Sequence, residues 1–501
     1  MLKLLLTLLL PLPLLAQPAP ADSARARRIA AVRPVLDKIY ADFAASKHVP
    51  GLAYGLVVDG RLAYSNALGY GNLTTKTLAT PRTVFRIASM SKSFVALAVL
   101  RLRDEGRLRL DEPAAKYLPE LQRHPPAGFD TPPITIRQLL SHAAGLPEDN
   151  PWGDRQMGRA DADLDALVGR GLPLATAPGE AYQYSNLGYA LLGRIIGRIT
   201  GQPFQAYVSA HLLRPLGMSH TYWDYRQVPP ALLAAGYRRT ADAWQPEPLL
   251  PNGESWAALG GLLTTVEDFS KYLVFLADAW PARLGPDAGP VRRSSVREAQ
   301  QPWAFSNLNA GYRYPSGRAC ALVSSYGYGL RVSQDCAGRR YVGHGGGLPG
   351  FGSHWWLLPD YGVAVVALTN QTYAGPTAAN FAALDTLLAL ARLRPRPVTA
   401  SAVLRQRKEQ LAKLLPGWEA VDKQLFAGNF FLDEDLASRR QTAQTLFAQV
   451  GRVLNVGELE PDDALRGRFR LRGERGSVEV FFTLSPETPA RVQQLDLRLV
   501  R

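Results

Sequence analysis

The feature that most constrains this chain is a serine and a lysine separated by two residues, Ser89 and Lys92, in an apolar setting. Residues three positions apart lie on the same face of a helix, so the lysine amine can reach the serine hydroxyl. A buried lysine can lose its proton near neutral pH, and the neutral amine is then a general base for a nucleophilic serine. The apolar run from Phe94 to Leu100 predicts a buried helix that begins at about Ser89, where free backbone N–H groups favour negative charge.

Two more motifs follow at long spacing, first Y-x-N at Tyr184 and Asn186 and then H-x-G at His344 and Gly346. A chain of this composition contains roughly half an S-x-x-K by chance, so the motif is informative only together with the other two. A phenol, with a pKa of about 10 in water, needs a nearby cation to carry protons at neutral pH, and Lys92 would supply it. Asn186 would hydrogen-bond Lys92 or a substrate amide.

Each motif residue also has a purely structural interpretation. Ser89 could be a helix-capping serine, and Lys92 could be a solvated surface lysine. Tyr184 could be a core aromatic residue, Asn186 a turn residue and His344 a strand residue that bonds to its neighbours. Glycines after the histidine would allow a strand to approach a substrate without side chains in between.

Together these residues resemble the serine β-lactamase and penicillin-binding-protein-like superfamily, in its class C-like branch of esterases, D-aminopeptidases and carboxypeptidases. The chain departs from the S-D-N and K-T-G signatures of related enzymes, because Tyr184-Ser185-Asn186 and His344-Gly345-Gly346 stand in their places. The similarity extends over about residues 35 to 390. Further stretches that resemble family blocks are Phe85–Ser89, Leu139–Pro147, Pro215–Met218, Gly260–Thr264 and Gly343–Phe351.

The resemblance implies an α+β fold, in which helices flank an antiparallel sheet beside an all-helical region. It assigns the nucleophile to Ser89, and proton transfer to Lys92 and Tyr184. His142 then has a structural role, because the base is Lys92 with Tyr184. Substrate contacts or backbone donors to an oxyanion are implied at four positions: Asn186, His344, Gly346 and Gly347.

The implied reaction is acyl transfer to water through a serine acyl-enzyme, with no cofactor and no metal. Loss of the K-T-G lysine favours esters or D-amino-acid peptides and amides as small-molecule substrates. A class C-like β-lactamase or a penicillin-binding D,D-carboxypeptidase is the first alternative. A catalytically inert envelope binding protein of the same fold is the second. No G-x-S-x-G elbow is present, which argues against an α/β-hydrolase.

Composition and charge narrow the compartment and the partners. An apolar run from Leu4 to Leu15 after Lys3 predicts a signal peptide over residues 1–16, hence a periplasmic or extracellular protein. The run is too short to span a bilayer, so no stable membrane insertion is expected. The net charge of +14 comes from scattered arginines, which argues against nucleic-acid binding. The oligomeric state stays open, as does a disulfide between Cys320 and Cys336.

Composition along the chain predicts two domains. Residues 17–395 form the hydrolase domain, which includes a hairpin turning at Asp59-Gly60 and a closing helix over Asn380–Leu393. Residues 396–501 form a linker helix and a small β-rich accessory domain, because alternating strands follow a Pro-Arg-Pro break. We expect this domain to be similar to the lipocalin-like tails of some enzymes in this family.

Overall fold

The computed structural model describes residues 23–122, 130, 132–283 and 285–500, and the predicted signal peptide lies outside them. Two compact units are formed. The first contains the described residues up to Ala279 and from Asp287 to Arg394, and the second contains Trp280–Pro286 and the described residues from Pro395 onward. No helix within these described ranges is both long and apolar enough to cross a bilayer.

Over the described residues, the centre of the first unit is a nine-stranded sheet in which every pairing is antiparallel. Its strand order is β3-β2-β1-β13-β12-β11-β10-β9-β8, so the first and last long strands of the unit meet in the middle. In chain order the strands are β1 (Gly51–Val58), β2 (Arg61–Asn72), β3 (Thr77–Leu78), β8 (Ala304–Asn309), β9 (Leu322–Tyr326), β10 (Arg331–Asp335), β11 (Arg340–Leu348), β12 (Phe351–Leu358) and β13 (Val363–Thr369).

The hairpin predicted at Asp59-Gly60 joins β1 to β2. Both turn residues have positive φ angles, 48° for Asp59 and 78° for Gly60, the conformation that a two-residue hairpin of this type needs. All of β1 is buried, because both of its faces are covered. Leu56 belongs to the core under α1 and α10, whereas a Cβ on Gly55 would lie 2.6 Å from Val266 of α8.

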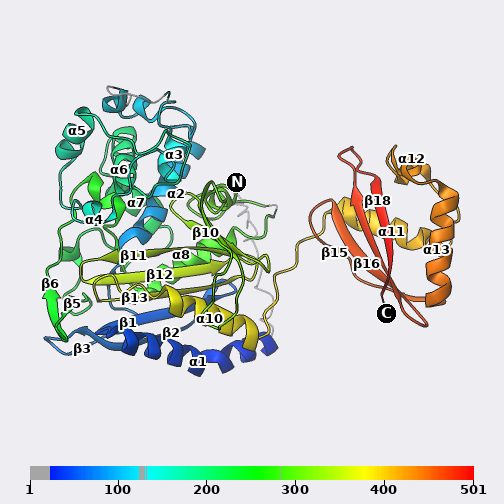
Figure 1. Ribbon diagram of the computed structural model, residues 1–501, viewed down its shortest axis with the longest axis horizontal. Coiled ribbons are helices and arrows are strands. Elements are labelled where there is room, and N and C mark those ends of the chain that lie inside the picture. The colour runs from blue at the N-terminus through cyan, green and yellow to red at the C-terminus, as the bar shows by residue number, and fades with distance from the viewer. Residues whose placement is uncertain (1–22, 123–129, 131, 284, 501) are drawn as a thin grey trace, which may run out of the picture. The chain divides into compact units, whose positions relative to one another are not determined.

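Helices cover the sheet and form a separate helical region (Figure 1). Figure 1 shows α1 and α10 side by side along the sheet, and α8 packs against β1, β2 and β13. The expected α+β fold is therefore confirmed. The helices of this unit are α1 (Ser23–Lys47), α2 (Lys92–Asp104), α3 (Ile136–Leu140), α4 (Asn150–Gly153), α5 (Asp161–Gly169), α6 (Asn186–Thr200), α7 (Phe204–Val208), α8 (Val266–Asp278), α9 (Arg293–Ala299) and α10 (Thr377–Leu390).

Short elements connect the sheet to the helical region. Two two-stranded ribbons are formed by β4 (Phe85–Arg86) with β7 (Leu263–Thr264), and by β5 (Gly236–Thr240) with β6 (Ala243–Glu247). The single-turn elements of this unit are η1 (Ala88–Ser91), η2 (Ala114–Lys116), η3 (Pro119–Gln122), η4 (Ser209–Leu213), η5 (Tyr225–Gln227) and η6 (Ser255–Leu259). A disulfide between Cys320 and Cys336 joins the start of β9 to the end of β10.

The second unit contains the expected C-terminal sheet, but also a helix that the sequence analysis assigned to strands. Over the described residues its sheet is open, with the order β14-β16-β17-β18 and with β15 paired to β16, so it is not a closed lipocalin-like barrel. The missed helix buries Ala443, Phe447 and Val450, spaced by four and three residues in a mostly polar segment. The elements are α11 (Ala402–Leu414), η7 (Lys423–Leu425), α12 (Phe430–Asp433), α13 (Leu436–Val450), β14 (Val453–Val456), β15 (Glu460–Pro461), β16 (Arg466–Gly473), β17 (Ser477–Leu484) and β18 (Val492–Val500).

Candidate active site

Ser89 lies in a single 3-10 turn, η1, and the α-helix that follows begins at Lys92 rather than at Ser89. The turn is tight because Ala88 has a φ of 49°, which a residue with a side chain rarely adopts. Strand β11 packs against this turn, so the sheet and the helical region meet at Ser89. Strained backbone conformations of this kind persist only where the surrounding packing holds the residue in place, and they are common in active sites.

Lys92 is fully buried and has three polar neighbours. Its Nζ lies 2.7 Å from Asn186 Oδ1, 2.5 Å from the Leu259 carbonyl oxygen and 3.0 Å from Ser89 Oγ. The first two are acceptors only, so they take both N–H bonds of a neutral amine. Asn186 keeps this orientation because its Nδ2 donates to Asn150 Oδ1 at 3.0 Å. The remaining lone pair of Lys92 therefore faces the Ser89 hydroxyl.

Burial lowers the pKa of Lys92 to about 7. The carboxylates of Asp154 and Asp149 oppose this shift, while Arg331 adds to it. Near pH 7 about half of the Lys92 amines are then neutral. Lys92 is thus placed to accept a proton from Ser89, and a large fraction of it is in the neutral form that can do so at pH 7.

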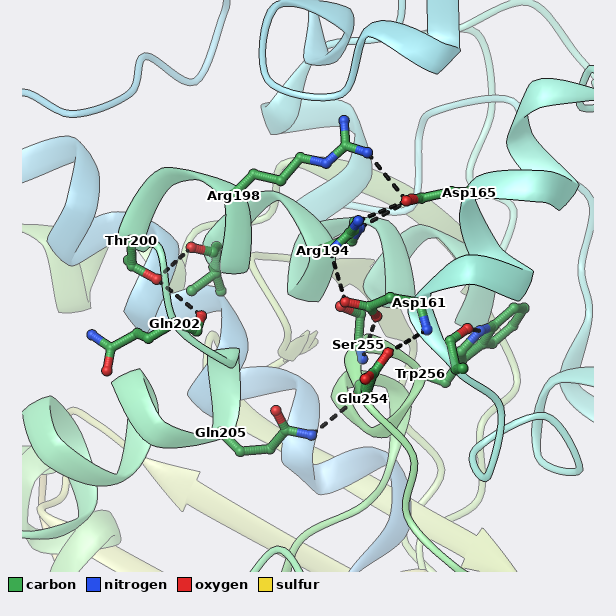
Figure 2. A network of polar contacts seen from close by, with 12 residues as sticks. Asp161, Asp165, Arg194, Arg198, Thr200, Gln202, Gln205, Glu254, Ser255 and Trp256 are labelled. Atoms are coloured by element: carbon green, nitrogen blue, oxygen red, sulfur yellow. Dashed lines mark hydrogen bonds and ion pairs between the residues drawn. The ribbon is translucent and has the colours of Figure 1, made fainter.

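A polar network in the helical region supports the carbonyl that binds Lys92 (Figure 2). The Arg194 side chain on α6 bridges Asp161 and Asp165 of α5 at 2.8 and 2.6 Å. Asp161 Oδ1 in turn accepts a hydrogen bond from the Ser255 N–H at the start of η6. Leu259 is the last residue of η6. The network therefore holds in place the carbonyl oxygen that accepts a hydrogen bond from Lys92.

Tyr184 is buried over Lys92, whose Nζ lies 5.0 Å from the centre of the phenol ring. Burial raises the pKa of Tyr184 well above its usual range, while the Ser89 hydroxyl and the Arg331 guanidinium act in the opposite direction. The cation expected beside the phenol is present, but the group keeps its proton at neutral pH. Tyr184 is therefore able to donate a proton at neutral pH.

Asp149 holds the Tyr-Ser-Asn segment in place, a role that sequence reasoning missed. Its Oδ1 accepts from the Asn186 N–H at 2.6 Å, and its Oδ2 accepts from the Leu187 N–H at 2.8 Å. These are free N–H groups at the start of α6, which a carboxylate satisfies. His142 contributes as well, because its Nδ1 accepts from the Ser185 N–H at 3.1 Å. Asp149 lies two residues after the family-like block Leu139–Pro147, but its residue type alone did not mark it.

His344 is buried, neutral and bonded at both ring nitrogens. Its Nδ1 lies 2.5 Å from the Gly345 carbonyl and must donate to it, so Nε2 accepts from the Tyr326 hydroxyl at 2.8 Å. Burial lowers the pKa of His344 well below its usual range, and Arg331 and Lys92 act in the same direction. His344 therefore supplies no cation at the K-T-G position.

Arg331 supplies the permanent charge that His344 lacks. It is the first residue of β10 and pairs in register with Gly343 on β11, one residue before His344. Its guanidinium lies 5.8 Å from the centre of the Tyr184 ring. No described carboxylate forms an ion pair with it. Arginine is common in this basic chain, and no motif marks this one, so only the fold identifies it.

A cavity of about 290 Å³ opens over Ser89. Ser89, Tyr184, His344, Gly346 and Gly347 all line it, whereas Lys92 and Asn186 lie behind Ser89 and reach it only through their hydrogen bonds. The sequence-predicted residues are therefore brought together. The remaining lining residues are Asn150, Asp154, Arg331, Gly345 and Tyr373.

Gly346 is where β11 comes closest to the nucleophile turn. A Cβ at this position would collide with the Ile87 carbonyl oxygen and with Ser353 Oγ, which are themselves hydrogen-bonded at 2.9 Å. We expect Gly346→Ala to separate β11 from η1 and to lower kcat/KM for p-nitrophenyl acetate by about 10²-fold, since small displacements of reacting groups cost that much.

Gly345→Ala is the matched control for Gly346→Ala. A Cβ at Gly345 would meet the His354 ring at 3.4 Å and the Ser353 carbonyl oxygen at 3.8 Å, which are ordinary contacts. We expect it to cost less than about tenfold in the same assay, because the strand need not move. Equal losses in the two variants would show that close approach at Gly346 is unimportant.

An antiparallel sheet beside a helical region, with serine, lysine and tyrosine at their junction, defines the β-lactamase and penicillin-binding-protein-like class of serine hydrolase folds. The chain belongs to the Beta-lactamase family, whose model matches residues 36–389. The resemblance seen in the sequence is thereby confirmed.

Individual relatives agree with this assignment. Protein flp of Staphylococcus aureus (strain MW2) is 30% identical over 65% of this chain, and the aligned part is only 61% of that protein. Penicillin-binding protein 4* of Bacillus subtilis (strain 168) is 25% identical over 85% of this chain and 89% of its own length.

Solved structures show the same fold. The octameric penicillin-binding protein homologue from Pyrococcus abyssi has a TM-score of 0.57 and 22% identity, and the match covers 93% of this chain and 98% of that one. The penicillin-binding protein from Bacillus halodurans has a TM-score of 0.55 and 25% identity, with 70% and 98% coverage.

Proposed function

We propose that this protein is an exported serine hydrolase that acts through an acyl-enzyme at Ser89 on esters or on D-amino-acid peptides and amides. The observation that carries the proposal is the hydrogen bonding of Lys92. Its two N–H bonds go to Asn186 and Leu259, and its lone pair faces the nucleophile. An inert binding protein would have no need of a buried amine with a pKa of about 7 beside a serine.

Acylation follows from these positions. Lys92 takes the proton of the Ser89 hydroxyl as Oγ bonds to the substrate carbonyl carbon. The oxyanion is assigned to the backbone N–H groups of Ser89 and Gly347, two residues that both line the cavity. As the bond to the leaving group breaks, the leaving group takes the phenolic proton of Tyr184, and the proton on Lys92 restores the phenol.

Deacylation runs the same proton path in reverse. Water attacks the acyl carbon, and the neutral Lys92 with Tyr184 removes a proton from it. The carbon–Oγ bond breaks, Ser89 regains a proton, and the acid product leaves. No cofactor takes part in these steps.

A β-lactam hydrolase is the second candidate, and Arg331 is the observation that favours it. The guanidinium provides a fixed positive charge in the cavity, which can bind the carboxylate of a β-lactam. Neutral esters need no such charge. The choice between the two substrate classes is therefore a matter of measured preference.

Export is supported by two features. The apolar run at Leu4–Leu15 has the composition of a signal peptide, and the Cys320–Cys336 disulfide suits an oxidising compartment.

Labelling with a fluorophosphonate probe, followed by mapping of the adduct, tests the proposed function. We expect one covalent adduct, located on Ser89, and turnover of p-nitrophenyl acetate that exceeds turnover of nitrocefin in kcat/KM. If the probe does not label the protein, an inert binding protein becomes the preferred function. Preference for nitrocefin would promote the β-lactamase.

A further inference from the structure

Two unpaired charges of opposite sign line the cavity at Ser89. Arg331 forms no ion pair with a described carboxylate, and Asp154 forms none with a described cation. Both nevertheless contribute to the surface of the same 290 Å³ space. A charge that is removed from bulk water without a partner is costly, so a protein that keeps one at a cavity wall has a use for it. Arg331 suits a carboxylate, and Asp154 suits a cation.

Asp154 is held so that one oxygen is free. It directly follows α4 and is only 5% exposed. Its Oδ2 accepts a hydrogen bond from the Tyr373 hydroxyl at 3.1 Å. Its Oδ1 has no hydrogen-bond donor among the described residues. This oxygen is also not fully buried, so it stays accessible from the cavity. Tyr373 orients the carboxylate, which leaves Oδ1 able to accept from a ligand in the cavity.

Asp154 is charged at neutral pH despite its burial. Burial raises its pKa to about 6, against the opposing effects of Lys92 and the Tyr373 hydroxyl. A pKa of about 6 is below the pH of a neutral medium, so the carboxylate form prevails there. Lys92 does not neutralise it by contact, because the three Nζ bonds of that lysine go to Ser89, Asn186 and Leu259.

The neighbours of Asp154 place it on the side of the cavity that receives the acyl group. Asn150, one turn earlier, accepts from Asn186 Nδ2, and a Cβ on Gly153 would lie 2.6 Å from the Asn186 side chain. Tyr184, which protonates the leaving group in the proposed reaction, is instead close to Arg331. In the proposed reaction the leaving group thus lies toward Tyr184 and Arg331, which leaves the part of the cavity lined by Asp154 and Tyr373 for the acyl group.

We propose that Asp154, oriented by Tyr373, binds a protonated amine on the acyl part of the substrate, so that the preferred substrates are esters or amides of amino acids with a free ammonium group. This inference rests on the proposed acyl-enzyme function. It goes beyond that function because catalysis by Ser89 and Lys92 requires no charge on the acyl group. An ammonium would donate to Oδ1, forming a charge-assisted hydrogen bond.

Two esters that differ by a single ammonium group test the inference. D-alanine p-nitrophenyl ester and p-nitrophenyl propionate share a leaving group and an acyl skeleton. Each kcat/KM at pH 7 is divided by the spontaneous hydrolysis rate constant of that ester, which removes the intrinsic activation by the ammonium. We expect the corrected preference of the wild-type protein for the alanine ester to be at least tenfold. A smaller preference would overturn the inference without any variant.

Asp154→Asn removes the charge and keeps the shape and the acceptor for Tyr373. Hydrogen bonds to charged groups contribute about 1.5–3 kcal/mol, so the corrected preference should fall by about 10- to 100-fold. Glu148→Gln is the control, because Glu148 is an exposed carboxylate of the same segment that does not line the cavity. It should keep the wild-type preference.

The outcomes separate the two proposals. An unchanged preference in Asp154→Asn refutes the ammonium subsite, and so does an equal loss on both esters, since Asp154 would then act only through the catalytic groups. If Asp154→Asn does not fold, the wild-type preference decides. Failure of the proposed function would look different: p-nitrophenyl propionate would be hydrolysed equally by the wild type and by Ser89→Ala.

Discussion

Ser89→Ala will remove covalent labelling by a fluorophosphonate and will lower kcat for p-nitrophenyl acetate by about 10⁴- to 10⁶-fold. Losses of this size are typical when the nucleophile of an acyl-enzyme mechanism is deleted. The fold should survive, because the Ser89 hydroxyl lies at the wall of the cavity and contacts only side chains of the site, Lys92 and Tyr184. Intact-mass spectrometry after labelling and initial rates with the ester give the two readouts.

Ser93→Ala is the control for this loss. Ser93 is buried one turn further along α2, and its hydroxyl donates to the Met90 carbonyl rather than to a cavity group. Labelling and activity should persist in that variant. An active, labelled Ser89→Ala protein would remove Ser89 from the mechanism altogether.

Lys92→Ala and Tyr184→Phe will each lower kcat/KM by about 10²- to 10⁴-fold, the range for a positioned acid or base. The double variant will lose far less than the product of the two, because groups that move one proton in succession act as a unit. Their contact supports this expectation, since Lys92 Nζ lies 5.0 Å from the Tyr184 ring centre. Rates of all four proteins with p-nitrophenyl acetate complete the cycle, and multiplicative losses would show independent roles.

Tyr189→Phe is the matched control for Tyr184→Phe. Tyr189 is also buried near Lys92, with 5.6 Å between Nζ and its ring centre, but its hydroxyl donates to the Leu140 carbonyl. It should affect stability more than turnover.

The pH profile of the wild type follows from the Lys92 pKa of about 7. Because the neutral amine is the active form, kcat/KM should fall tenfold per pH unit below about pH 7. The Lys92→Ala protein should lack this dependence.

Local chemistry made much of the fold predictable, and long-range packing accounts for the part that was not. The turn at Asp59-Gly60 specifies its own hairpin, and the apolar segment Phe94–Leu100 forms the buried part of α2, as predicted. In contrast, α13 buries only a narrow row of apolar side chains, and these form a core only together with other elements of the second unit. The apolar residues of α13 do have helical spacing, but they are too few for the pattern to distinguish a helix from strands.

The candidate site divides in the same way. Ser89, Lys92 and Asn186 could be named from spacing, because their chemistry depends on residue type and order. Asp154 and Arg331 could not, because no motif marks them and only the fold brings both to the wall of the cavity. Arg331 belongs to β10, a strand to which no motif drew attention.

The order of strands in the large sheet sets the time at which this protein can become active. Leu52 on β1 pairs with Thr369 on β13, so the middle of the sheet cannot close until nearly all of the first unit has been synthesised. Pairings so distant along the chain form slowly, because a long loop must close first. A growing chain therefore cannot complete this sheet until β13 has been made. Ser89 is made early, but β11, the strand that packs against its turn, is made late, so the cavity at Ser89 is complete only when most of the first unit is present.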